Sequence, residues 1–192
     1  MILTTERLVL REFTMDDWPA VLAYQADPRY LRYYPPTHTT AEDARAFVRR
    51  FVRWQVERPR RRYQLAIVLK ADGRLVGNCG IRASTADVPG DAPFKADIGY
   101  EIAAPYWGQG YATEAARAML AYGFETLKLH RIWARCVADN VASARVLEKL
   151  GMRLEGRLRD NERFKGRYWD TLLYSILASE WRSQQERLSR KE

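Results

Sequence analysis

The stretch PYWGQGYATEA, residues 105–115, constrains the fold of this chain most. A strand-like run, KADIGYEIA at 95–103, precedes it, and small and apolar residues at helical spacing follow it. A turn between a strand and a helix directs the first backbone N–H groups of the helix toward one point, where the helix dipole favours an anion. Gly108 and Gly110 lack the Cβ atoms that would obstruct a close approach. Taken alone, the turn fits a phosphate site and a tight turn that needs glycine for its φ angles equally well.

Two common nucleotide-binding motifs do not fit this turn. A P-loop requires G-x-x-x-x-G-K-[ST], and the chain contains no such run. A dinucleotide fold requires G-x-G-x-x-G/A in its first strand–helix–strand unit, whereas the third position here is Thr113. The unit also comes after several strands, and about 50 residues follow it, which is too few for a doubly wound sheet.

Periodicity along the rest of the chain predicts an α+β domain. The predicted strands are 6–12, 63–70, 74–83, 95–103, 131–138, 152–163 and 168–178. The predicted helices are 14–27, a run from Thr40 that ends before Pro59, 112–127 and 139–150. This order predicts a mixed, mostly antiparallel central sheet flanked by about four helices. The crossover from 95 to 138 should join two parallel strands.

Short signals locate the turns between these elements. Thr14 and Thr40 are suited to cap the first two helices. The dipeptide Asp72-Gly73 predicts a hairpin, and Gly151 is suited to the left-handed residue after a helix. A loop rich in Pro, Gly and Asp is expected at 85–93.

Length and composition favour one soluble domain. The chain has 192 residues, of which 47% are hydrophobic and 29% charged, and we assign 1–182 to the domain and 183–192 to a polar tail. No apolar run is long enough for a membrane helix, and we find no signal peptide. Cys79 and Cys136 lie in strand-like runs, as free thiols of a cytoplasmic protein would. The two histidines, one of them His38, lie far apart, so we expect no metal site.

The net charge of +8 is partly local, because eight arginines fall between residues 45 and 62. One interpretation is an attraction for phosphates or acidic surfaces, and the other is a solvated helix face and loop. The run RPRRR alone suggests nucleic-acid binding, but no nucleic-acid motif accompanies it, and we expect no nucleic-acid partner.

Three motifs together give this chain a family resemblance. DIGYEIA, YWGQGYATEA and DNVASARVLEKLGM, in this order, resemble the GNAT superfamily of N-acetyltransferases. The signature of that superfamily, Q/R-x-x-G-x-G/A, falls on residues 107–112, with Trp107 in the Gln/Arg position. The form of the turn, the opening TERLVLREF and the closing GRYWD look like the RimJ/RimL branch of ribosomal-protein N-terminal acetyltransferases and their relatives. The resemblance covers residues 4–181.

The resemblance implies acetyl-CoA as the acetyl donor. The amides that would hold its pyrophosphate, beside Gly108, are those of Gln109, Gly110, Tyr111, Ala112 and Thr113. The pantetheine arm would lie along the backbone at Ile102 and Ala103, which requires the sheet to splay open after that strand. Arg117 and Arg145 are candidates for the ribose phosphate, or are ordinary surface arginines.

The expected reaction is direct attack of a primary amine on the thioester. A backbone N–H near Ile102 or Ala103 could stabilise the oxyanion. Many GNAT enzymes protonate the leaving thiolate with a Tyr in the helix after the 131–138 strand, and this chain has no Tyr there. The RimL-like pattern instead indicates Ser143 for this role and Asn140 as a contact of the pantetheine arm. The alternative is local, with Asn140 capping the helix and Ser143 serving its first turn.

Two carboxylates are candidates for the general base. The RimL-like pattern indicates Glu162, whose alternative role is an exposed hairpin charge. Glu101, on the strand beside the expected thioester, is the other candidate, and its alternative role is to pair with an arginine. An α-amino group, with a pKa of about 8, could also react without a dedicated base. Tyr33 and Tyr34 could shape the acceptor site, or could be core aromatics.

The sequence therefore predicts an acetyl-CoA-dependent N-acetyltransferase of the GNAT fold. Its acceptor would be a protein N-terminal amine or a small amine, and a homodimer is plausible by resemblance. The alternative is an acyl-CoA-binding sensor or interaction module without turnover.

Overall fold

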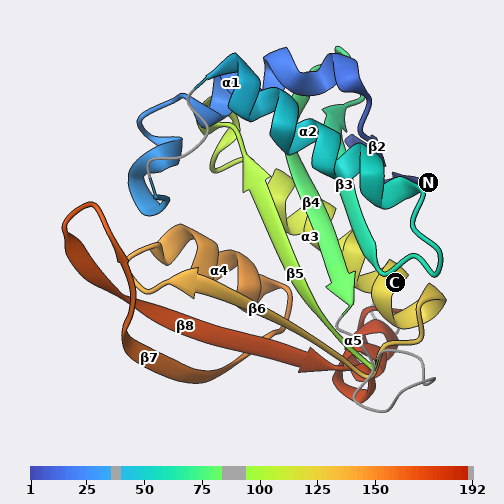
Figure 1. The fold of residues 1–192 in the computed structure, drawn as a ribbon. Coiled ribbons are helices and arrows are strands. Elements are labelled where there is room, and N and C mark those ends of the chain that lie inside the picture. Colours follow the sequence, from blue (N-terminus) through green and yellow to red (C-terminus); the bar gives the residue numbers. More distant parts are fainter. Residues whose placement is uncertain (36–39, 84–93, 190–192) are drawn as a thin grey trace.

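The computed structural model describes residues 1–35, 40–83 and 94–189, and Figure 1 shows their arrangement. The loop expected at 85–93, His38 and the last residues of the expected tail lie outside these ranges. The strands are β1 (Ile2–Thr4), β2 (Leu8–Glu12), β3 (Arg62–Leu69), β4 (Leu75–Ala83), β5 (Lys95–Ile102), β6 (Arg131–Val137), β7 (Arg153–Phe164) and β8 (Arg167–Leu177). The α-helices are α1 (Trp18–Gln25), α2 (Ala41–Gln55), α3 (Tyr111–Ala121), α4 (Val141–Lys149) and α5 (Ala178–Ser189).

The strands form one sheet in the order β1-β2-β3-β4-β5-β6-β8-β7. Within the described residues β5 and β6 are the one parallel pair, and the other neighbours are antiparallel. The predicted α+β class and the mixed, mostly antiparallel sheet are therefore confirmed. Each predicted strand and helix is present, β1 is an additional strand, and the described residues form five α-helices instead of about four.

The predicted splay of the sheet lies between β5 and β6. The two strands pair only from Lys95↔Arg131 to Asp97↔Trp133 and then diverge, as Figure 1 shows. The end of β5 therefore presents a free backbone edge toward the start of α4. This opening divides the sheet into two arms, one of β1 to β5 and one of β6 to β8.

Two apolar clusters hold the helices on the sheet. The larger one joins α3, α4 and α5 to the sheet, and Met119, Leu120 and Ile132 at its centre are fully buried. The smaller one joins α1 and α2 to the opposite face, through residues such as Val48 and Phe51. The helices thus cover both faces and leave the opening between β5 and β6 accessible.

Local signals act as the sequence predicts at Thr40, Gly73 and Gly151, whereas Thr14 is followed by a 3-10 turn at Met15–Asp17 and α1 begins after Asp17. The Thr40 hydroxyl accepts the Asp43 N–H at 3.2 Å and begins α2. Gly73 and Gly151 have φ angles of 72° and 78°, in the left-handed region. Cys79 and Cys136 are free and buried.

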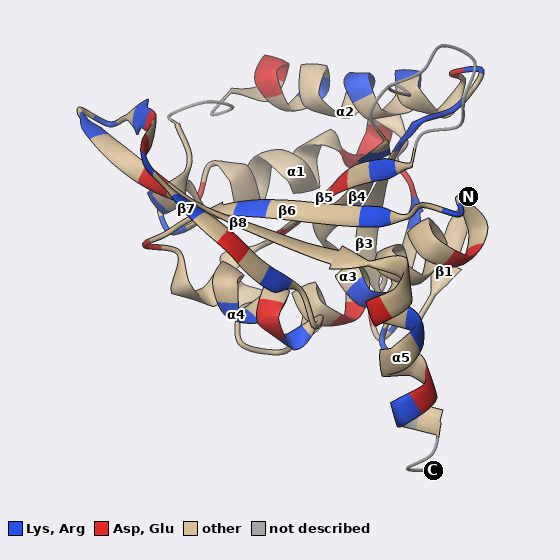
Figure 2. Ribbon diagram, turned by 90° about the horizontal axis from the view of Figure 1, so that it is seen from below, with Lys and Arg blue, Asp and Glu red and all other residues tan. Residues whose placement is uncertain are grey.

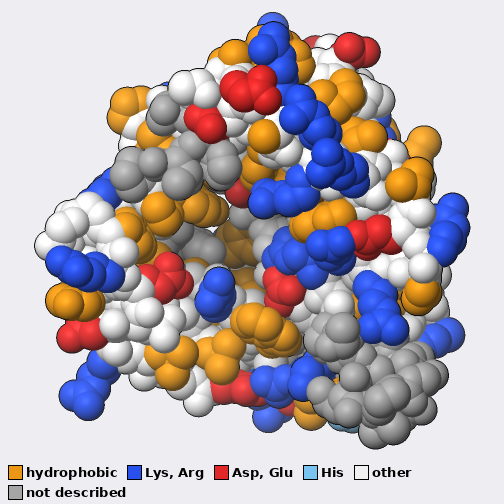
Figure 3. Space-filling model, in the orientation of Figure 1, with side chains coloured by type: hydrophobic (Ala, Val, Ile, Leu, Met, Phe, Trp, Pro, Cys, Tyr) orange, Lys and Arg blue, Asp and Glu red, His pale blue; other side chains and the backbone are white. Residues whose placement is uncertain are grey.

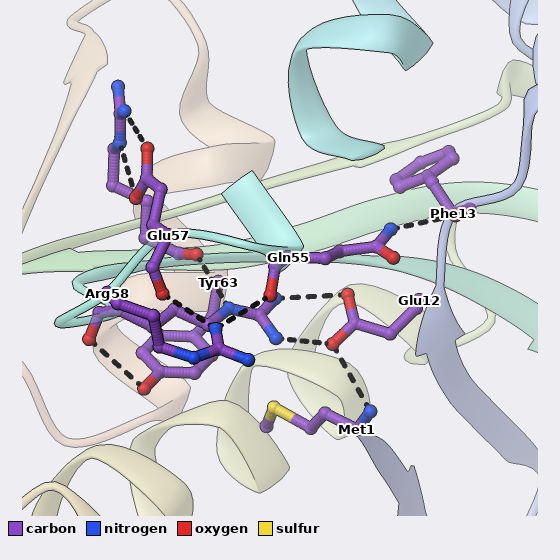
Figure 4. Close-up of polar contacts among 9 residues, drawn as sticks. Met1, Glu12, Phe13, Gln55, Glu57, Arg58 and Tyr63 are labelled. Atoms are coloured by element: carbon purple, nitrogen blue, oxygen red, sulfur yellow. Dashed lines mark hydrogen bonds and ion pairs between the residues drawn. The ribbon is translucent and has the colours of Figure 1, made fainter. Parts of the chain in front are cut away.

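Most of the arginines between residues 45 and 62 have structural contacts. Arg60 donates to both carboxylate oxygens of Glu12, and Arg45 stacks on the Trp18 ring at 4.2 Å. Figure 4 shows this region, where Gln55 also donates to the Phe13 carbonyl at 2.8 Å. Figure 2 shows Lys and Arg interspersed with Asp and Glu over the described molecule. The interpretation of these arginines as part of a helix face and loop therefore accounts for many of them.

Helix α5 was not expected from the sequence, which placed the start of a polar tail at residue 183. Its residues ASEWRSQQERLS are mostly polar, and one buried aromatic side chain packs the helix against the core. The Trp181 side chain is 3% exposed and stacks on Phe124, with ring centroids 5.8 Å apart. Within the described residues, no helix is long and apolar enough to cross a membrane.

We predict that Trp181→Ala lowers the free energy of unfolding by about 3 kcal/mol, because it removes a buried aromatic and leaves a cavity. Urea unfolding followed by circular dichroism measures this change. Val56→Ala, at a side chain that is 74% exposed, is the control and should change stability by less than about 0.5 kcal/mol. A loss of less than about 1 kcal/mol at Trp181 would contradict the anchoring role.

Candidate active site

The turn between β5 and α3 has the backbone geometry of an anion site. Gly108 and Gly110 have φ angles of 76° and 82°, so both need glycine for their conformation. A Cβ on Gly108 would meet no atom within 4 Å, which means that the space beside the turn is open. Gly110 is the N-cap residue of α3, and no side chain of the described residues caps this helix. The first N–H groups of α3 are therefore free to bind a ligand.

An N-terminal segment braces this turn from outside. Glu114, in the first turn of α3, accepts from the Thr5 hydroxyl at 2.6 Å and from the Arg7 N–H at 2.8 Å. The Arg7 guanidinium also binds Glu114, donates to the Gln109 carbonyl at 2.9 Å and lies over the Tyr111 ring. Burial alone would raise the pKa of Glu114, but the bonds from Thr5 and Arg7 outweigh it and lower that pKa. This brace has no local signal in the sequence, because its two halves are about a hundred residues apart.

A cleft of about 470 Å³ lies in the opening between β5 and β6, and Figure 3 shows a hollow in this part of the molecule. The expected site residues that line it are Tyr33, Tyr34, Glu101, Ile102, Gly108, Gly110, Tyr111, Ala112, Thr113, Asn140, Ser143 and Arg145. Ala103, Gln109 and Glu162 are outside its lining, and Arg117 borders a separate depression beside α3 and α5. The cleft thus brings together four segments of the chain.

The contact that Trp107 makes with the edge of β5 explains its place in the turn. Its indole Nε1 donates to the Ile102 carbonyl at 2.6 Å, which ties the turn to the end of the strand. The Ala103 N–H donates a hydrogen bond to the Val76 carbonyl at 2.8 Å, so it points toward β4. Because neighbouring residues of a strand direct their backbone groups to opposite edges, the Ile102 N–H faces the opening. Of the two expected oxyanion donors, the geometry therefore leaves Ile102.

Asn140 and Ser143 lie where α4 begins at the cleft. The Asn140 side chain accepts the Ser143 N–H at 3.2 Å, so the capping role considered from the sequence is present. The Ser143 hydroxyl lies 3.0 Å from the Tyr100 hydroxyl, and either could donate. Burial raises the pKa of the Tyr100 phenol, which therefore stays protonated. Tyr100 was not among the residues predicted for the site. Its phenol comes from β5 and lies beside Ser143, at the start of α4, a helix that has no tyrosine of its own.

Glu101 lies on the other side of β5, on the floor of the cleft. Its Oε2 atom accepts from the Tyr24 hydroxyl at 3.1 Å, from Gln25 at 3.3 Å and from Asn78 at 2.6 Å. Within the described residues Glu101 has no ion-pair partner, so the pair with an arginine that the sequence analysis considered is not formed. Burial, and next the Glu101 charge, raise the pKa of Tyr30, so this phenol remains a neutral donor beside the carboxylate. Three side chains, from α1 and β4, therefore fix Glu101 in one orientation.

Glu162 is not brought into the cleft. It lies on β7 opposite Trp169 and accepts from the Thr171 hydroxyl at 3.4 Å. The β7–β8 pairing shifts between Leu158 and Glu162, which changes the direction of the side chains near the end of this arm.

Tyr33 and Tyr34 both pack against other aromatic rings and line the cleft. Tyr34 stacks on Tyr30 with ring centroids 4.8 Å apart, and Tyr33 packs edge-on against Trp169 at 6.2 Å. Both tyrosines also line the cleft. They form the wall opposite α4 and connect the α1–α2 side to the β7–β8 arm.

Comparison with known proteins agrees with this geometry. The family model described as an acetyltransferase (GNAT) domain matches residues 7–153. The uncharacterized N-acetyltransferase YnaD of Bacillus subtilis is 35% identical over 94% of this chain and 99% of its own. The [ribosomal protein uS5]-alanine N-acetyltransferase of Escherichia coli is 31% identical over 44% of this chain and 43% of its own.

Solved structures show the same fold. The GNAT-family acetyltransferase from Bacillus anthracis has a TM-score of 0.79 and 34% identity, and the match covers 93% of this chain and 99% of that one. RimL, described as a ribosomal L7/L12 alpha-N-protein acetyltransferase in complex with coenzyme A, has a TM-score of 0.77 and 21% identity over 92% and 98% of the two chains. The chain therefore belongs to the GNAT acetyltransferases and is a RimJ/RimL-like N-acetyltransferase.

Proposed function

We propose that this chain transfers the acetyl group of acetyl-CoA to a primary amine by direct attack of the amine. The observation that carries the proposal is the cleft at the β5–β6 opening. It joins an uncapped helix N-terminus, a free strand edge, a fixed carboxylate and a pair of hydroxyl groups. These are the groups that bind a pyrophosphate, align a thioester and move two protons.

The donor would lie along the turn and the edge of β5. The amides of α3 between Gly110 and Thr113 would hold the pyrophosphate, with the Arg7–Glu114 brace fixing their direction. The Ile102 N–H faces the thioester carbonyl in this placement and stabilises the developing oxyanion. The exposed guanidinium of Arg145, at the rim of the cleft, would meet the outer phosphate.

Proton transfer divides between the two faces of β5. Glu101 accepts a proton from the attacking ammonium group, because only the neutral amine is a nucleophile. On the opposite face, Ser143 donates a proton to the leaving sulfur and regains one from solvent as CoA leaves, and the neutral Tyr100 phenol stabilises the Ser143 oxygen by a hydrogen bond. We prefer Glu101 to Glu162 as the base because Glu101 lines the cleft.

The acceptor in this proposal is a protein N-terminal amine or a small amine. The first is supported by the names of RimL and of the uS5-alanine acetyltransferase, which act on ribosomal proteins. Release of CoA thiol over a panel of amines tests the activity and would also separate it from acyl-CoA binding without turnover. The panel should hold short peptides with free N-termini and small amines.

We expect Arg7→Ala to raise the Kd for acetyl-CoA about tenfold, because the turn loses its contacts to Gln109 and Glu114. Isothermal titration calorimetry measures this. Arg49→Ala, on the outer surface of α2, is the matched control and should change the Kd less than about twofold. Wild-type affinity in a folded Arg7→Ala protein would show that the turn holds its shape without the brace.

Ser143→Ala should lower kcat about a hundredfold with little change in the Kd for acetyl-CoA, since it removes the proton donor. Tyr100→Phe should lower kcat about tenfold, because one supporting hydrogen bond is lost. Tyr168→Phe, at a side chain that is 58% exposed, is the control for loss of a phenol hydroxyl. Unchanged kcat in both Ser143→Ala and Tyr100→Phe would remove this pair from the mechanism.

The two candidate bases can be separated by matched variants. Glu101→Gln keeps the shape of the side chain and should lower kcat/KM about a hundredfold. Glu162→Gln should lower it less than about twofold, because that carboxylate is outside the cleft. Steady-state kinetics with one acceptor measures both variants. A larger loss of kcat/KM in Glu162→Gln than in Glu101→Gln would assign the base to Glu162.

A further inference from the structure

A row of polar side chains lies on the face of the sheet that carries Glu101. Alternate residues of β4 are directly opposite alternate residues of β5, in the pairs Asn78↔Glu101, Gly80↔Gly99 and Arg82↔Asp97. Because alternate residues of a strand share a face, all six positions lie on one side of the sheet. The polar pairs are therefore separated by a pair of glycines that has no side chains.

A side chain from β3 fills the gap that these glycines leave. Gln64 is directly opposite Gly80, and a Cβ on Gly80 would overlap the Gln64 amide oxygen. A Cβ on Gly99 would lie 3.0 Å from the Nη2 atom of Arg82. The glycines thus let Gln64 reach between Asn78 and Arg82, and Gln64 and Asn78 are only 4% and 1% exposed.

Hydrogen bonds join four of these side chains in one line, which we call the amide network: Arg82, Gln64, Asn78 and Glu101. Arg82 Nη1 donates to Gln64 Oε1 at 3.0 Å. Gln64 Nε2 donates to Asn78 Oδ1 at 2.6 Å, and Asn78 Nδ2 donates to Glu101 Oε2 at 2.6 Å. The rest of the Arg82 guanidinium donates to Asp97. The amide network therefore connects the proposed base to an ion pair outside the cleft.

Arg82 sets the direction of every bond in the amide network. A guanidinium can only donate, so the Gln64 amide must turn its oxygen to Arg82 and its NH2 group to Asn78. Asn78 must then turn its oxygen to Gln64 and its NH2 group to Glu101. The second N–H of that group donates to the Tyr24 hydroxyl at 2.7 Å, so both N–H groups of Asn78 are used in this orientation.

This direction favours the ionised form of Glu101, because hydrogen bonds donated to a carboxylate stabilise its charge. If the Asn78 amide turned over, its oxygen would face the carboxylate and its N–H groups would face those of Gln64. If Gln64 turned over as well, its N–H groups would face Arg82. Each alternative places like groups together, so the guanidinium at one end of the amide network determines what Glu101 meets at the other end.

The other titratable and charged groups around Glu101 come from α1, α2 and the segment between these helices. They are Tyr24, Tyr30, Tyr34 and Arg50. Burial raises the pKa of each of the three phenols, which therefore stay neutral. The positive charge of Arg50 interacts with Glu101 and also favours its ionised form. A test of the amide network must therefore separate the direction of its hydrogen bonds from the charge of a nearby cation.

We propose that Arg82 is a positioning residue for acetyl transfer, which acts through Gln64 and Asn78 to keep an N–H donor on Oε2 of Glu101. This inference rests on the proposed function, in which Glu101 takes a proton from the amine. Since Tyr24, Gln25 and Asn78 all donate to Oε2, the other oxygen, Oε1, receives that proton. Arg82 lies outside the cleft lining and acts on the reaction only through the amide network.

The test is the pH profile of kcat/KM between pH 5 and 9 with one acceptor, the amidated peptide Ala-Gln-Gln-Ala, so that titration of the amine is the same for every variant. Arg82→Gln/Asp97→Asn removes the donor-only end of the amide network without changing the net charge. Its acid limb should move up by about half a pH unit, because the neutral form of Glu101 is no longer disfavoured by the network.

A second variant reverses the direction of the amide network without changing its shape. Gln64→Glu has two acceptor oxygens, so Asn78 must turn its NH2 group to residue 64 and its oxygen to Glu101. The acid limb should then move up by about one pH unit or more. The Kd for acetyl-CoA, measured by calorimetry, should stay within about twofold of wild type in both variants, because the network lies outside the donor site.

Two controls assign the shift to the amide network. Arg82→Lys keeps a donor-only cation and should move the acid limb less than the double variant does. Arg131→Gln/Glu155→Gln removes another ion pair, at 2.8 Å, between β6 and β7, and should leave the limb within about 0.2 pH unit of wild type.

An acid limb within about 0.2 pH unit of wild type in both Gln64→Glu and Arg82→Gln/Asp97→Asn would overturn this inference, even if kcat/KM fell equally at every pH. An equal shift in the Arg131→Gln/Glu155→Gln control would also overturn it. Both results leave the proposed acetyl transfer in place. Wild-type kcat/KM in Glu101→Gln would overturn the base assignment and this inference together, and absence of CoA release with every acceptor would overturn the proposed function itself.

Discussion

The site of this protein depends on the early end of the pairing between β5 and β6. Three paired positions, from Lys95 to Asp97, hold the two arms of the sheet together, and beyond them the strands diverge. The free edge of β5 and the beginning of α4 then face each other across a cleft. Because the sheet is otherwise continuous and covered by helices on both faces, this opening is where a thioester and an amine could reach backbone and side chains from both arms.

Strand β5 organises the chemistry because alternate residues point to opposite faces. Tyr100 points toward α4 and meets Ser143, whereas Glu101 points toward α1 and is held by Tyr24, Gln25 and Asn78. The proposed proton donor, Ser143, and the proposed proton acceptor, Glu101, can therefore lie on opposite sides of the thioester. The turn that follows β5 supplies free helix amides, so a short segment of chain carries most of the proposed site.

Much of the fold and part of the site could be predicted from the sequence, because their signals are local. Gly108 and Gly110 indicated the turn, and Asn140 indicated the start of α4. The contacts that complete the site are not local. Arg7 reaches Glu114, and Tyr100 reaches Ser143, only after the sheet has formed. Glu162 was selected by resemblance alone, and the irregular β7–β8 pairing leaves it outside the cleft.

We propose that acetyl-CoA lies in the β5–β6 opening, along the turn between β5 and α3. The most direct test is amide hydrogen exchange with and without acetyl-CoA, because a bound ligand protects the N–H groups that it covers. Bound acetyl-CoA should slow exchange at residues 110–113 and at Ile102. Protection confined to other segments, or no protection at a saturating concentration of acetyl-CoA, would contradict this placement.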